Sequence, residues 1–567
     1  MTLSSAANFR RTIMTTTILG LDGADWQIID SLLERGELPV LGGLIEKGCH
    51  GTLHSTTPPN SPPAWASMIT GVNPGKHNIF DFTYIDQAYK KVPVDAMSRI
   101  AALPLWQILN RFGMSTGVVN LPIHYPAEPV NGFVICGLVT PWSAEVFTYP
   151  PEISREIGSP ADHWLIGQTL VRGGSPKEFL EEIRTKTRTQ TDWILRLQKE
   201  HRPDFLMAVF DGTDKMQHFF WKHWDKTHSR HDPRAARELR EAIPAYYRYV
   251  DACLGEVLQA RGETDVFIVS DHGFTRMEQD VFIENWLIQN GYLRLKSAPP
   301  SAAQKQFEKT GRSLWNTFAG NGTLKAILKR NKLTNWLIGR VKSKAEENEK
   351  ASKLNQNVDW SATRVFFGGV SSQSLQVNLK GRQTFGIVEP EEYEPLVREV
   401  IAGLAKILDP VSGKPVVKAA YSRDELYHGS WTENAADVIV ITEDGYSLQE
   451  GFPNHLVAES NLYGTDRSGG HRPEGIFIAC GPNIRSNPVR MEARITDITP
   501  TVLYLNKLPI PDYADGSVLT DLVDETYLAS NPLEITDQIT LSQSKSVEMT
   551  PEEKELLENH LRALGYF

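Results

Sequence analysis

The chain has few cysteines, only four in 567 residues: Cys49, Cys136, Cys253 and Cys480. They are far apart in the sequence and none forms a CxxC pair. This spacing predicts neither a disulfide framework nor a cysteine-based zinc site in a chain of this size. We interpret the four residues as isolated buried thiols.

Long apolar runs are also missing. No stretch approaches the roughly 20 apolar residues that a membrane-spanning helix needs. Arg10 and Arg11 precede an apolar stretch, but the threonines at 15–17 interrupt it. A secretory signal would need about 7–15 consecutive apolar residues and a cleavage site. We therefore expect a cytoplasmic protein.

The chain carries no excess of basic charge. It has 59 Lys and Arg against 69 Asp and Glu, a formal net charge of −10. Nucleic acid is not expected as a partner, because phosphate backbones favour basic surfaces. Hydrophobic residues at 41% and charged residues at 23% are ordinary for a globular protein. No pattern indicates an oligomeric state.

Short apolar runs alternate with amphipathic segments along much of the chain. The runs that end directly before polar residues or turns are 18–21, 205–210, 266–269 and 476–479. Such runs are typical of strands buried on both faces, as in a parallel sheet. Trp26–Arg35 and Ala242–Leu258 have helical periodicity. The pattern predicts an α/β fold with a doubly wound, mostly parallel central sheet and helices on both faces.

Residues 296–435 form an expected insertion into this core. Its basic segment, 324–344, predicts a lid or packing helix, with a membrane-surface helix as the alternative. Short strands and one helix after residue 359 predict a small α+β cap. We expect the core to span 15–295 and 436–525, with the chain returning through Asp437–Thr442. A polar tail, 526–567, would follow, with a short helix near Pro551–Leu564.

Metal-type ligands are spread over nearly the whole chain, with one hydroxyl-bearing turn between them. They are Asp22 in ILGLDGAD, Ser61 in TPPNSPPAWASMITG, Asp214 and His218 in TDKMQH, Asp271 and His272 in VFIVSDHGF, and His471 in DRSGGHRP. Three Asp and three His suit two hard or borderline divalent ions, and a hydroxyl between them could act as a nucleophile. In a parallel sheet, functional groups collect beyond the carboxyl ends of strands, where Asp22 and Asp271 would fall.

Each motif alone has another interpretation. Asp214 and His218, four residues apart, would share one helix face and could hold one ion, but a surface ion pair or cap is equally compatible. Asp211 is a rival for Asp214. Asp271 could merely end a strand, with His272 beside it making ordinary hydrogen bonds.

The remaining candidates also stay open. Asp22 precedes a glycine and could belong to a turn, and His471 could lie in a flexible loop. Ser61 precedes Pro62 and Pro63, which suit a first helical turn, so it could simply be an N-cap. As part of a helix N-terminus it would instead face an anionic phosphoryl group, with backbone N–H groups and the helix dipole nearby.

Taken together, the motifs resemble a known family. LDGAD, a hydroxyl residue nine positions before Thr70-Gly71, TDKMQH, SDHGF and GGH occur here in the order found in the alkaline phosphatase superfamily. The chain is most similar to type I phosphodiesterase/nucleotide pyrophosphatase-like phosphohydrolases, over about Ile18 to Leu519.

The resemblance implies a metal-dependent phosphoric ester hydrolase with two divalent ions. We expect zinc, with manganese as the alternative. One ion would be held by Asp214, His218 and His471. The other would be held by the remaining set, Asp22, Asp271, His272 and Ser61. Ser61 would be the nucleophile and form a phosphoseryl intermediate, acting on a small-molecule phosphate ester. Thr56, Thr57 and Ser67 are weaker candidates, and His77 is expected to be structural.

Two departures narrow the resemblance. Nucleotide pyrophosphatases of this family carry Asn three residues after the nucleophile, where this chain has Ala64, so nucleotide specificity is not implied. Sulfatases carry Arg four residues after it, where this chain has Trp65. The rival functions are a metal-dependent phosphomutase of the same superfamily and a non-catalytic metal- or phosphate-binding protein. Contact with a membrane surface rests on segment 324–344 alone and is not expected.

Overall fold

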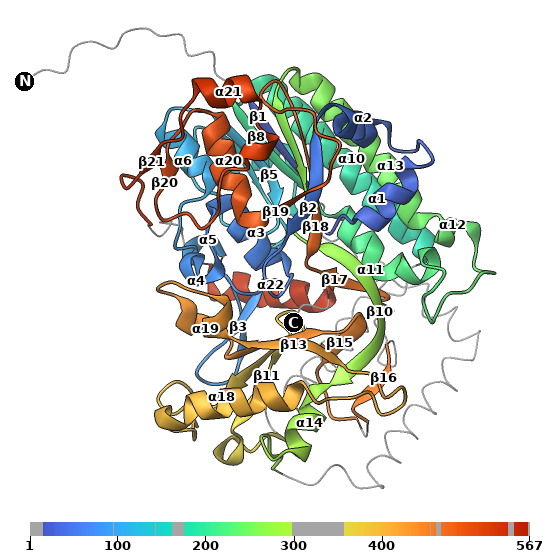
Figure 1. Cartoon of the computed structure of the whole chain (residues 1–567), viewed down its shortest axis with the longest axis vertical. Coiled ribbons are helices and arrows are strands. Elements are labelled where there is room, and N and C mark those ends of the chain that lie inside the picture. Colours follow the sequence, from blue (N-terminus) through green and yellow to red (C-terminus); the bar gives the residue numbers. More distant parts are fainter. Residues whose placement is uncertain are drawn as a thin grey trace, which may run out of the picture.

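The computed structural model describes residues 15–94, 96–141, 143–160, 175–296, 357–453, 455–460, 467–541 and 549–564. Its centre is a nine-stranded sheet in the order β19-β2-β18-β9-β1-β8-β5-β6-β7 (Figure 1). The strands are β1 Thr16–Leu21, β2 Cys49–His54, β5 Thr116–Leu121, β6 Gly132–Cys136, β7 Thr148–Tyr149, β8 Phe205–Phe210, β9 Asp265–Val269, β18 Glu474–Cys480 and β19 Met491–Arg494.

The middle of this sheet is parallel. β9, β1, β8, β5 and β6 are neighbours that all run in the same direction. Every residue of β1, β8 and β9 is buried, which explains their continuous apolar sequences. β18 runs antiparallel to both β9 and β2, so the expected mostly parallel sheet is confirmed with one reversed strand inside it.

Helices cover both faces of the sheet, as expected (Figure 1). One layer contains α1 Trp26–Leu33, α2 Pro39–Lys47, α10 Pro176–His201, α11 Gly212–Trp224 and α13 Ala242–Arg261. The other contains α3 Ser61–Thr70, α6 Leu105–Arg111 and α20 Ile498–Leu505. No helix among the described residues is both long enough and apolar enough to span a membrane.

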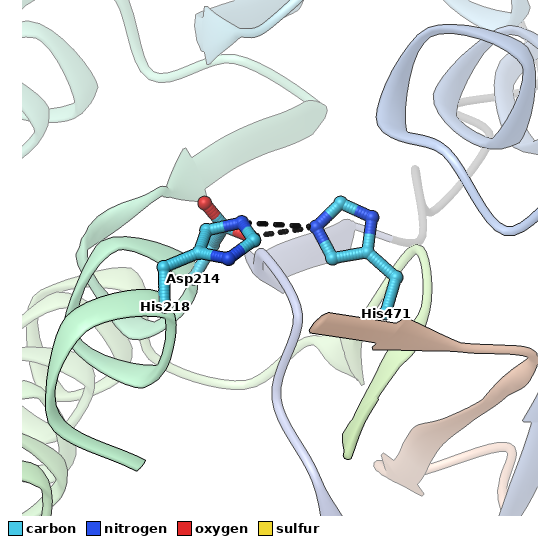
Figure 2. Close-up of side chains that lie close together, drawn as sticks. All are labelled: Asp214, His218 and His471. Atoms are coloured by element: carbon cyan, nitrogen blue, oxygen red, sulfur yellow. Dashed lines mark hydrogen bonds and ion pairs between the residues drawn. The ribbon is translucent and has the colours of Figure 1, made fainter. Parts of the chain in front are cut away.

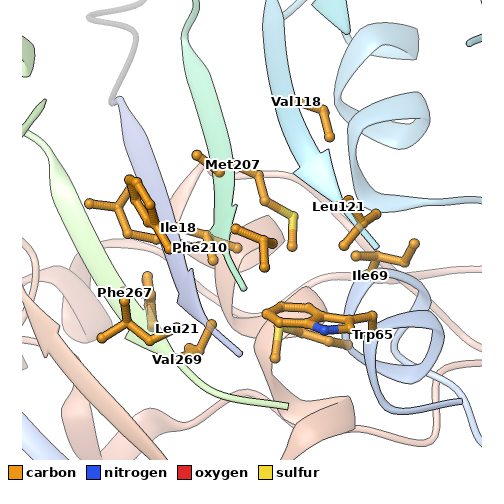
Figure 3. Packing of buried hydrophobic residues seen from close by; sticks show 14 of the residues in the cluster. Ile18, Leu21, Trp65, Ile69, Val118, Leu121, Met207, Phe210, Phe267 and Val269 are labelled. Carbon is orange, nitrogen blue, oxygen red and sulfur yellow. The ribbon is translucent and has the colours of Figure 1, made fainter. Parts of the chain in front are cut away.

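The core brings α3 close to the central strands. Figure 3 shows Trp65 of α3 among apolar side chains of the sheet, including Leu21 and Phe210. A Cβ atom at Gly20 would lie only 2.5 Å from the Trp65 ring. Glycine at this position of β1 therefore lets the indole pack this closely. The close packing of α3 also brings its first residue, Ser61, near the end of β1.

A smaller unit follows β10, Gly273–Phe282, which leads out of the core (Figure 1). β10 pairs with β15 Gly445–Gln449, β16 Val457–Glu459 and β17 Gly469–Arg472. A second sheet has the order β11-β12-β14-β13, formed by Val365–Gly369, Ser374–Val377, Val438–Thr442 and Val417–Ser422. Together with α14 Ile283–Gln289 and α18 Pro390–Leu404, these strands enclose their own apolar core and form the cap.

The expected cap is therefore present, but both of its predicted boundaries are wrong, because α14, which precedes residue 296, also belongs to it. The run Asp437–Thr442 does not return the chain to the main sheet, because β14 pairs with β12 and β13 of the cap. The chain rejoins the main sheet at β18. Segment 324–344 lies outside the described residues.

The C-terminal helix lies where the sequence predicts it. α22 spans Pro551–Leu564 and buries Leu557 and Leu561. Glu553 accepts a hydrogen bond of 2.6 Å from the Tyr125 hydroxyl, which follows β5. The tail is thus anchored to the core and does not fray at this point.

Glu284 should make the stability of the cap depend on pH. This buried residue of α14 accepts a hydrogen bond from Gly451 N, and burial raises the pKa of its carboxyl to about 7. A raised pKa means that the folded state keeps a proton that the unfolded state has lost, so stability falls as pH rises from about 4.3 towards 7. Between pH 5 and pH 8, the free energy of unfolding should therefore fall by about 1–3 kcal/mol less in Glu284→Gln than in the wild type. Urea unfolding at the two pH values would measure this difference.

The matched control for this prediction is Glu391→Gln on the exposed side of α18. It should leave the pH profile of unfolding unchanged. Parallel profiles for wild type and Glu284→Gln would show that Glu284 is ionised in the folded protein and would contradict the prediction.

Candidate metal centre

Asp214, His218 and His471 converge on one point. Asp214 and His218 lie one turn apart on α11, and His471 comes from β17; Figure 2 shows the three side chains pointing toward one another. Asp214 Oδ1 lies 3.2 Å from both His218 Nε2 and His471 Nε2, and the two imidazole nitrogens are 3.1 Å apart. These three atoms could contact a single cation.

Asp22, Asp271 and His272 form a second group of this kind. Asp22 follows β1, and Asp271 and His272 follow its neighbour β9. Their ligand atoms lie within 4.8 Å of one another, and all three residues are buried. Gly23 N donates to Asp271 Oδ1 at 3.0 Å, which ties the turn after β1 to the end of β9.

The two groups are adjacent because of the pairing between β10 and β17. His471 lies opposite Phe274 in this antiparallel pair, two residues after His272. As a result, the His471 and His272 rings stack with centroids 3.7 Å apart. A Cβ atom at Gly469 would lie 2.5 Å from Gln217 O, so β17 can approach α11 this closely only with glycine there.

Backbone carbonyls orient all three imidazoles in the same way. The Nδ1 atoms of His218, His471 and His272 face the carbonyl oxygens of Gly469, Pro59 and Gly273 at 2.8, 3.0 and 3.1 Å. A carbonyl oxygen can only accept, so each Nδ1 carries the proton and each Nε2 presents a lone pair. Two such lone pairs 3.1 Å apart cannot bond to each other, whereas a cation between them would use both.

The charges of the buried groups also fit cation binding. Burial lowers the pKa of His218 to about 4 and that of His272 well below its usual value, so both imidazoles are neutral. Burial raises the pKa of Asp271 to about 6, and burial together with Asp271 raises that of Asp22. Asp22 Oδ1 and Asp271 Oδ2 are buried without a hydrogen-bond partner among the described residues. The residues therefore suit two divalent cations, which would neutralise this set of carboxylates.

Ser61 lies against the second group. It is the first residue of α3 and is buried, and its Oγ is 3.3 Å from His272 Nε2. Trp65, one turn later, donates its indole N–H to Asp22 Oδ2 at 3.2 Å. Because α3 carries both residues, the helix that positions the hydroxyl also orients a carboxylate of the centre.

The rival residues are engaged elsewhere. Ser67 Oγ bonds to His77 Nε2 at 2.9 Å inside the core, which leaves His77 a structural residue as expected. Thr56 donates to Pro58 O at 3.0 Å. Asp211 is buried but is not a member of either group of potential ligands.

The start of α3 differs from the expectation in two respects. The N-cap is Asn60 and not Ser61, which lies inside the helix. Pro62 and Pro63 have no N–H group, and Ala64 N donates to Asn60 O. Of the first four helical residues, only Ser61 keeps a backbone donor for an anion, so the expected row of N–H groups is absent at this helix start.

Four polar side chains near the centre, which could be considered for contacts with phosphate oxygens, have partners within the protein. Arg472 donates to Asp25 Oδ2 at 2.8 Å, Gln217 bonds to Gly23 O and Tyr247, and Asn120 donates to Val209 O. Lys215 Nζ lies 3.7 Å from Asp214 Oδ2 and is buried at the centre. Lys215, like the other three, already has a partner, so the structure singles out none of the four for contact with phosphate oxygens.

Sequence reasoning missed three residues that support the centre. Trp65 holds Asp22, Asp25 binds both Arg472 and Phe274 N, and the Phe274 ring packs edge-on against His218 and His471. Asp25 stands inside the LDGAD motif, but nothing in the sequence pairs it with a residue 447 positions away.

Comparison with a family profile adds an independent finding. The profile of type I phosphodiesterase / nucleotide pyrophosphatase matches residues 16–461. The matched span contains every residue of the centre except His471, which lies ten positions beyond its end. Comparison with curated proteins gives no match.

Solved structures with a related arrangement are distant in sequence. Human ectonucleotide pyrophosphatase/phosphodiesterase 5 has 13% identity and a TM-score of 0.46, covering 90% of this chain and 100% of its own. Phosphonoacetate hydrolase from Sinorhizobium meliloti, in complex with phosphonoformate, has 14% identity and a TM-score of 0.48, covering 86% and 94%.

Proposed function

Because the chain belongs to the type I phosphodiesterase/nucleotide pyrophosphatase family, we propose that it hydrolyses phosphate esters at a pair of divalent cations, with Ser61 as nucleophile. The observation that carries this proposal is the orientation of three imidazoles. Their Nε2 lone pairs meet the carboxylates of Asp214, Asp22 and Asp271 beside a buried serine hydroxyl.

The ligands divide between two cations. Asp214, His218 and His471 would hold one cation. Asp22, Asp271, His272 and Ser61 would hold the other. Zinc suits these Asp and His ligands best, and manganese is the alternative. When bound, the two cations would stabilise negative charge on the reacting phosphoryl oxygens and on the attacking and leaving oxygens.

The residues of this chain define the path of the reaction. Ser61 Oγ forms a bond to phosphorus while the bond from phosphorus to the ester oxygen breaks, and the serine proton ends on the departing alcohol. A phosphoseryl intermediate results. Water then cleaves it, which restores the hydroxyl and releases the phosphate product. Burial of Ser61 excludes bulk water during the first step, and α3 fixes its direction of attack.

Elemental analysis combined with a substrate panel tests this function. The purified full chain should contain about two equivalents of zinc or manganese and should release product from p-nitrophenyl phosphomonoesters or diesters, with a phosphonate as third substrate class. Metal without turnover of any substrate would indicate a binding protein. Transfer of the phosphoryl group within a phosphosugar, in place of release to water, would indicate a mutase.

Removal of the metal should also destabilise the fold. The centre buries three carboxylates close together, and without cations their repulsion and lost hydration oppose folding. Treatment with a chelator at pH 8 should abolish activity and lower the thermal midpoint by a few degrees, because the unfolding entropy of a chain of this length makes 1 kcal/mol correspond to about 1 °C. Calorimetry before and after zinc is restored would measure it, and an unchanged midpoint would count against buried metal sites.

A further inference from the structure

A cleft of about 740 Å³ lies between the cap and the core. The core side is formed by the hairpin of β3 Thr83–Ile85 and β4 Lys91–Pro93 and by the end of α5 Ala96–Arg99. The cap side includes β12 and the start of α19 Arg423–Leu426. The volume falls within the range of about 300–1,000 Å³ that is typical of small-molecule sites. None of the seven residues of the metal centre lines this cleft.

The cleft begins directly behind the loop that carries the nucleophile. Pro58 lines it, three residues before Ser61. Tyr427 of the cap lines it and donates to Thr57 O at 2.6 Å. On the metal side of the same loop, Pro59 O bonds to His471. The same short loop therefore borders both spaces, with Pro58 facing the cleft and Pro59 facing the metal centre.

A buried carboxylate holds this loop in place. Asp81 lines the cleft and accepts hydrogen bonds from Asn60 Nδ2 and from Ser371 Oγ of the cap, both at 2.7 Å. The residue directly before Ser61 is thus tied to the wall of the cleft. Through Asp81, hydrogen bonds therefore join the wall of the cleft to the residue that precedes the nucleophile.

The lining is rich in uncharged hydrogen-bonding groups. Among the described residues, no hydrogen bond engages the side chains of Thr83, Gln87 or Gln376, which all face the cleft region. Other hydroxyl and amide side chains of the lining are Asn78, Ser372, Ser374, Gln383 and Asn434. These five already form hydrogen bonds within the protein, but an apolar ligand would leave the polar groups of Thr83, Gln87 and Gln376 without partners, which costs free energy.

Three of the four cationic side chains in the walls are already paired. Arg382 and Arg423 both contact Asp437, and Lys380 bonds to Glu389. The Arg99 guanidinium lies 3.8 Å over the Tyr84 ring. The cleft thus offers neutral donors and acceptors beside an aromatic ring, and not a concentration of free cations. This combination favours a ligand with many hydroxyl groups over a second anion or a lipid tail.

We propose that this cleft binds the organic group of the substrate and that this group is polyhydroxylated, as in a phosphate ester of a sugar. The assignment rests on the proposed hydrolase function, because it places the rest of the ester beside Ser61. It names a substrate class that the metal centre alone does not select, since that centre recognises only the phosphate.

Two p-nitrophenyl phosphodiesters that differ in one substituent test the proposal. Methyl p-nitrophenyl phosphate carries no hydroxyl group, whereas glucose 6-(p-nitrophenyl phosphate) carries a hexose. Both release the same alcohol. The metal-loaded full chain should show a kcat/KM at least about tenfold higher for the hexose diester, which corresponds to about 1.4 kcal/mol of added transition-state binding. Equal values for the two diesters would overturn the proposal.

Substitutions on opposite walls locate the effect. Gln376→Trp on the cap side and Thr83→Trp on the core side should each reduce the preference for the hexose diester at least about tenfold. Lys418→Trp, on an exposed position of the cap strand β13, should leave the preference intact. An equal fall for both diesters in both variants would mean that the cleft only supports the nucleophile loop, and would overturn the proposal.

A binding measurement separates this proposal from the hydrolase function. Calorimetry of the metal-loaded protein should show glucose 6-phosphate binding at least about tenfold more tightly than methyl phosphate, with the difference lost in Gln376→Trp. If no phosphomonoester or diester is hydrolysed but this difference is found, the hydrolase function is wrong and the cleft assignment stands. If the diesters are hydrolysed but the two phosphates bind equally, the cleft assignment is wrong and the function stands.

Discussion

Ser61→Ala is expected to lower product release by at least about 1,000-fold while about two equivalents of metal stay bound. The loss is large because the hydroxyl is the atom that forms the covalent bond to phosphorus, and the other hydroxyl at the Asp22, Asp271 and His272 group, that of Thr213, is engaged by the backbone oxygen of Asp22. The metal should remain because the six Asp and His ligands are unchanged. Steady-state kinetics and elemental analysis of the same preparation would measure both quantities.

Ser67→Ala is the matched control. It removes a hydroxyl from the same helix, but one that faces His77 in the core. It should cost some stability and change turnover by less than about tenfold. Substantial turnover by Ser61→Ala, with Ser67→Ala or a threonine variant inactive, would show that the wrong nucleophile has been chosen.

Asp271→Ala should remove both metal and activity. Asp271 Oδ2 is buried without a partner among the described residues, and Oδ1 accepts from Gly23 N, so this carboxylate both faces the centre and fixes the turn that carries Asp22. We expect about one equivalent of metal to be lost and activity to fall by about 100- to 10,000-fold. His218→Ala should do the same for the other cation.

Asp211→Ala provides the comparison, because Asp211 is a buried carboxylate close to the centre but outside both ligand groups. It should keep its full metal content. If Asp271→Ala or His218→Ala also retained two equivalents, that residue would have to be removed from the ligand set.

The strands of the core could be predicted because of how they are buried. β1, β8 and β9 are covered on both faces, so each reads as an unbroken apolar run that ends at a polar residue. The same property explains the error at β14, whose run resembles a core strand although it belongs to the cap. Local sequence reports burial, and does not report which sheet a strand joins.

The residues that meet at the candidate metal centre could be predicted from the sequence, but the groups that support them could not. Asp and His are recognisable by type and by the motifs around them. The groups that orient the imidazole rings are the backbone carbonyls of Gly469, Pro59 and Gly273. Every residue has a backbone carbonyl, so the sequence does not indicate which ones contact a histidine. Arg472 shows the same limit, since its pairing with Asp25 depends on the approach of β17 to the core.

The separation of the ligands along the chain has a consequence for biosynthesis. Asp22 emerges from the ribosome early, whereas His471 follows more than 400 residues later. Until β17 has been made and has paired with β10, Asp214 and His218 have no third partner. On the proposed ligand assignment, the cation of Asp214, His218 and His471 gains its third ligand only after residue 471 has been translated and β17 has paired with β10.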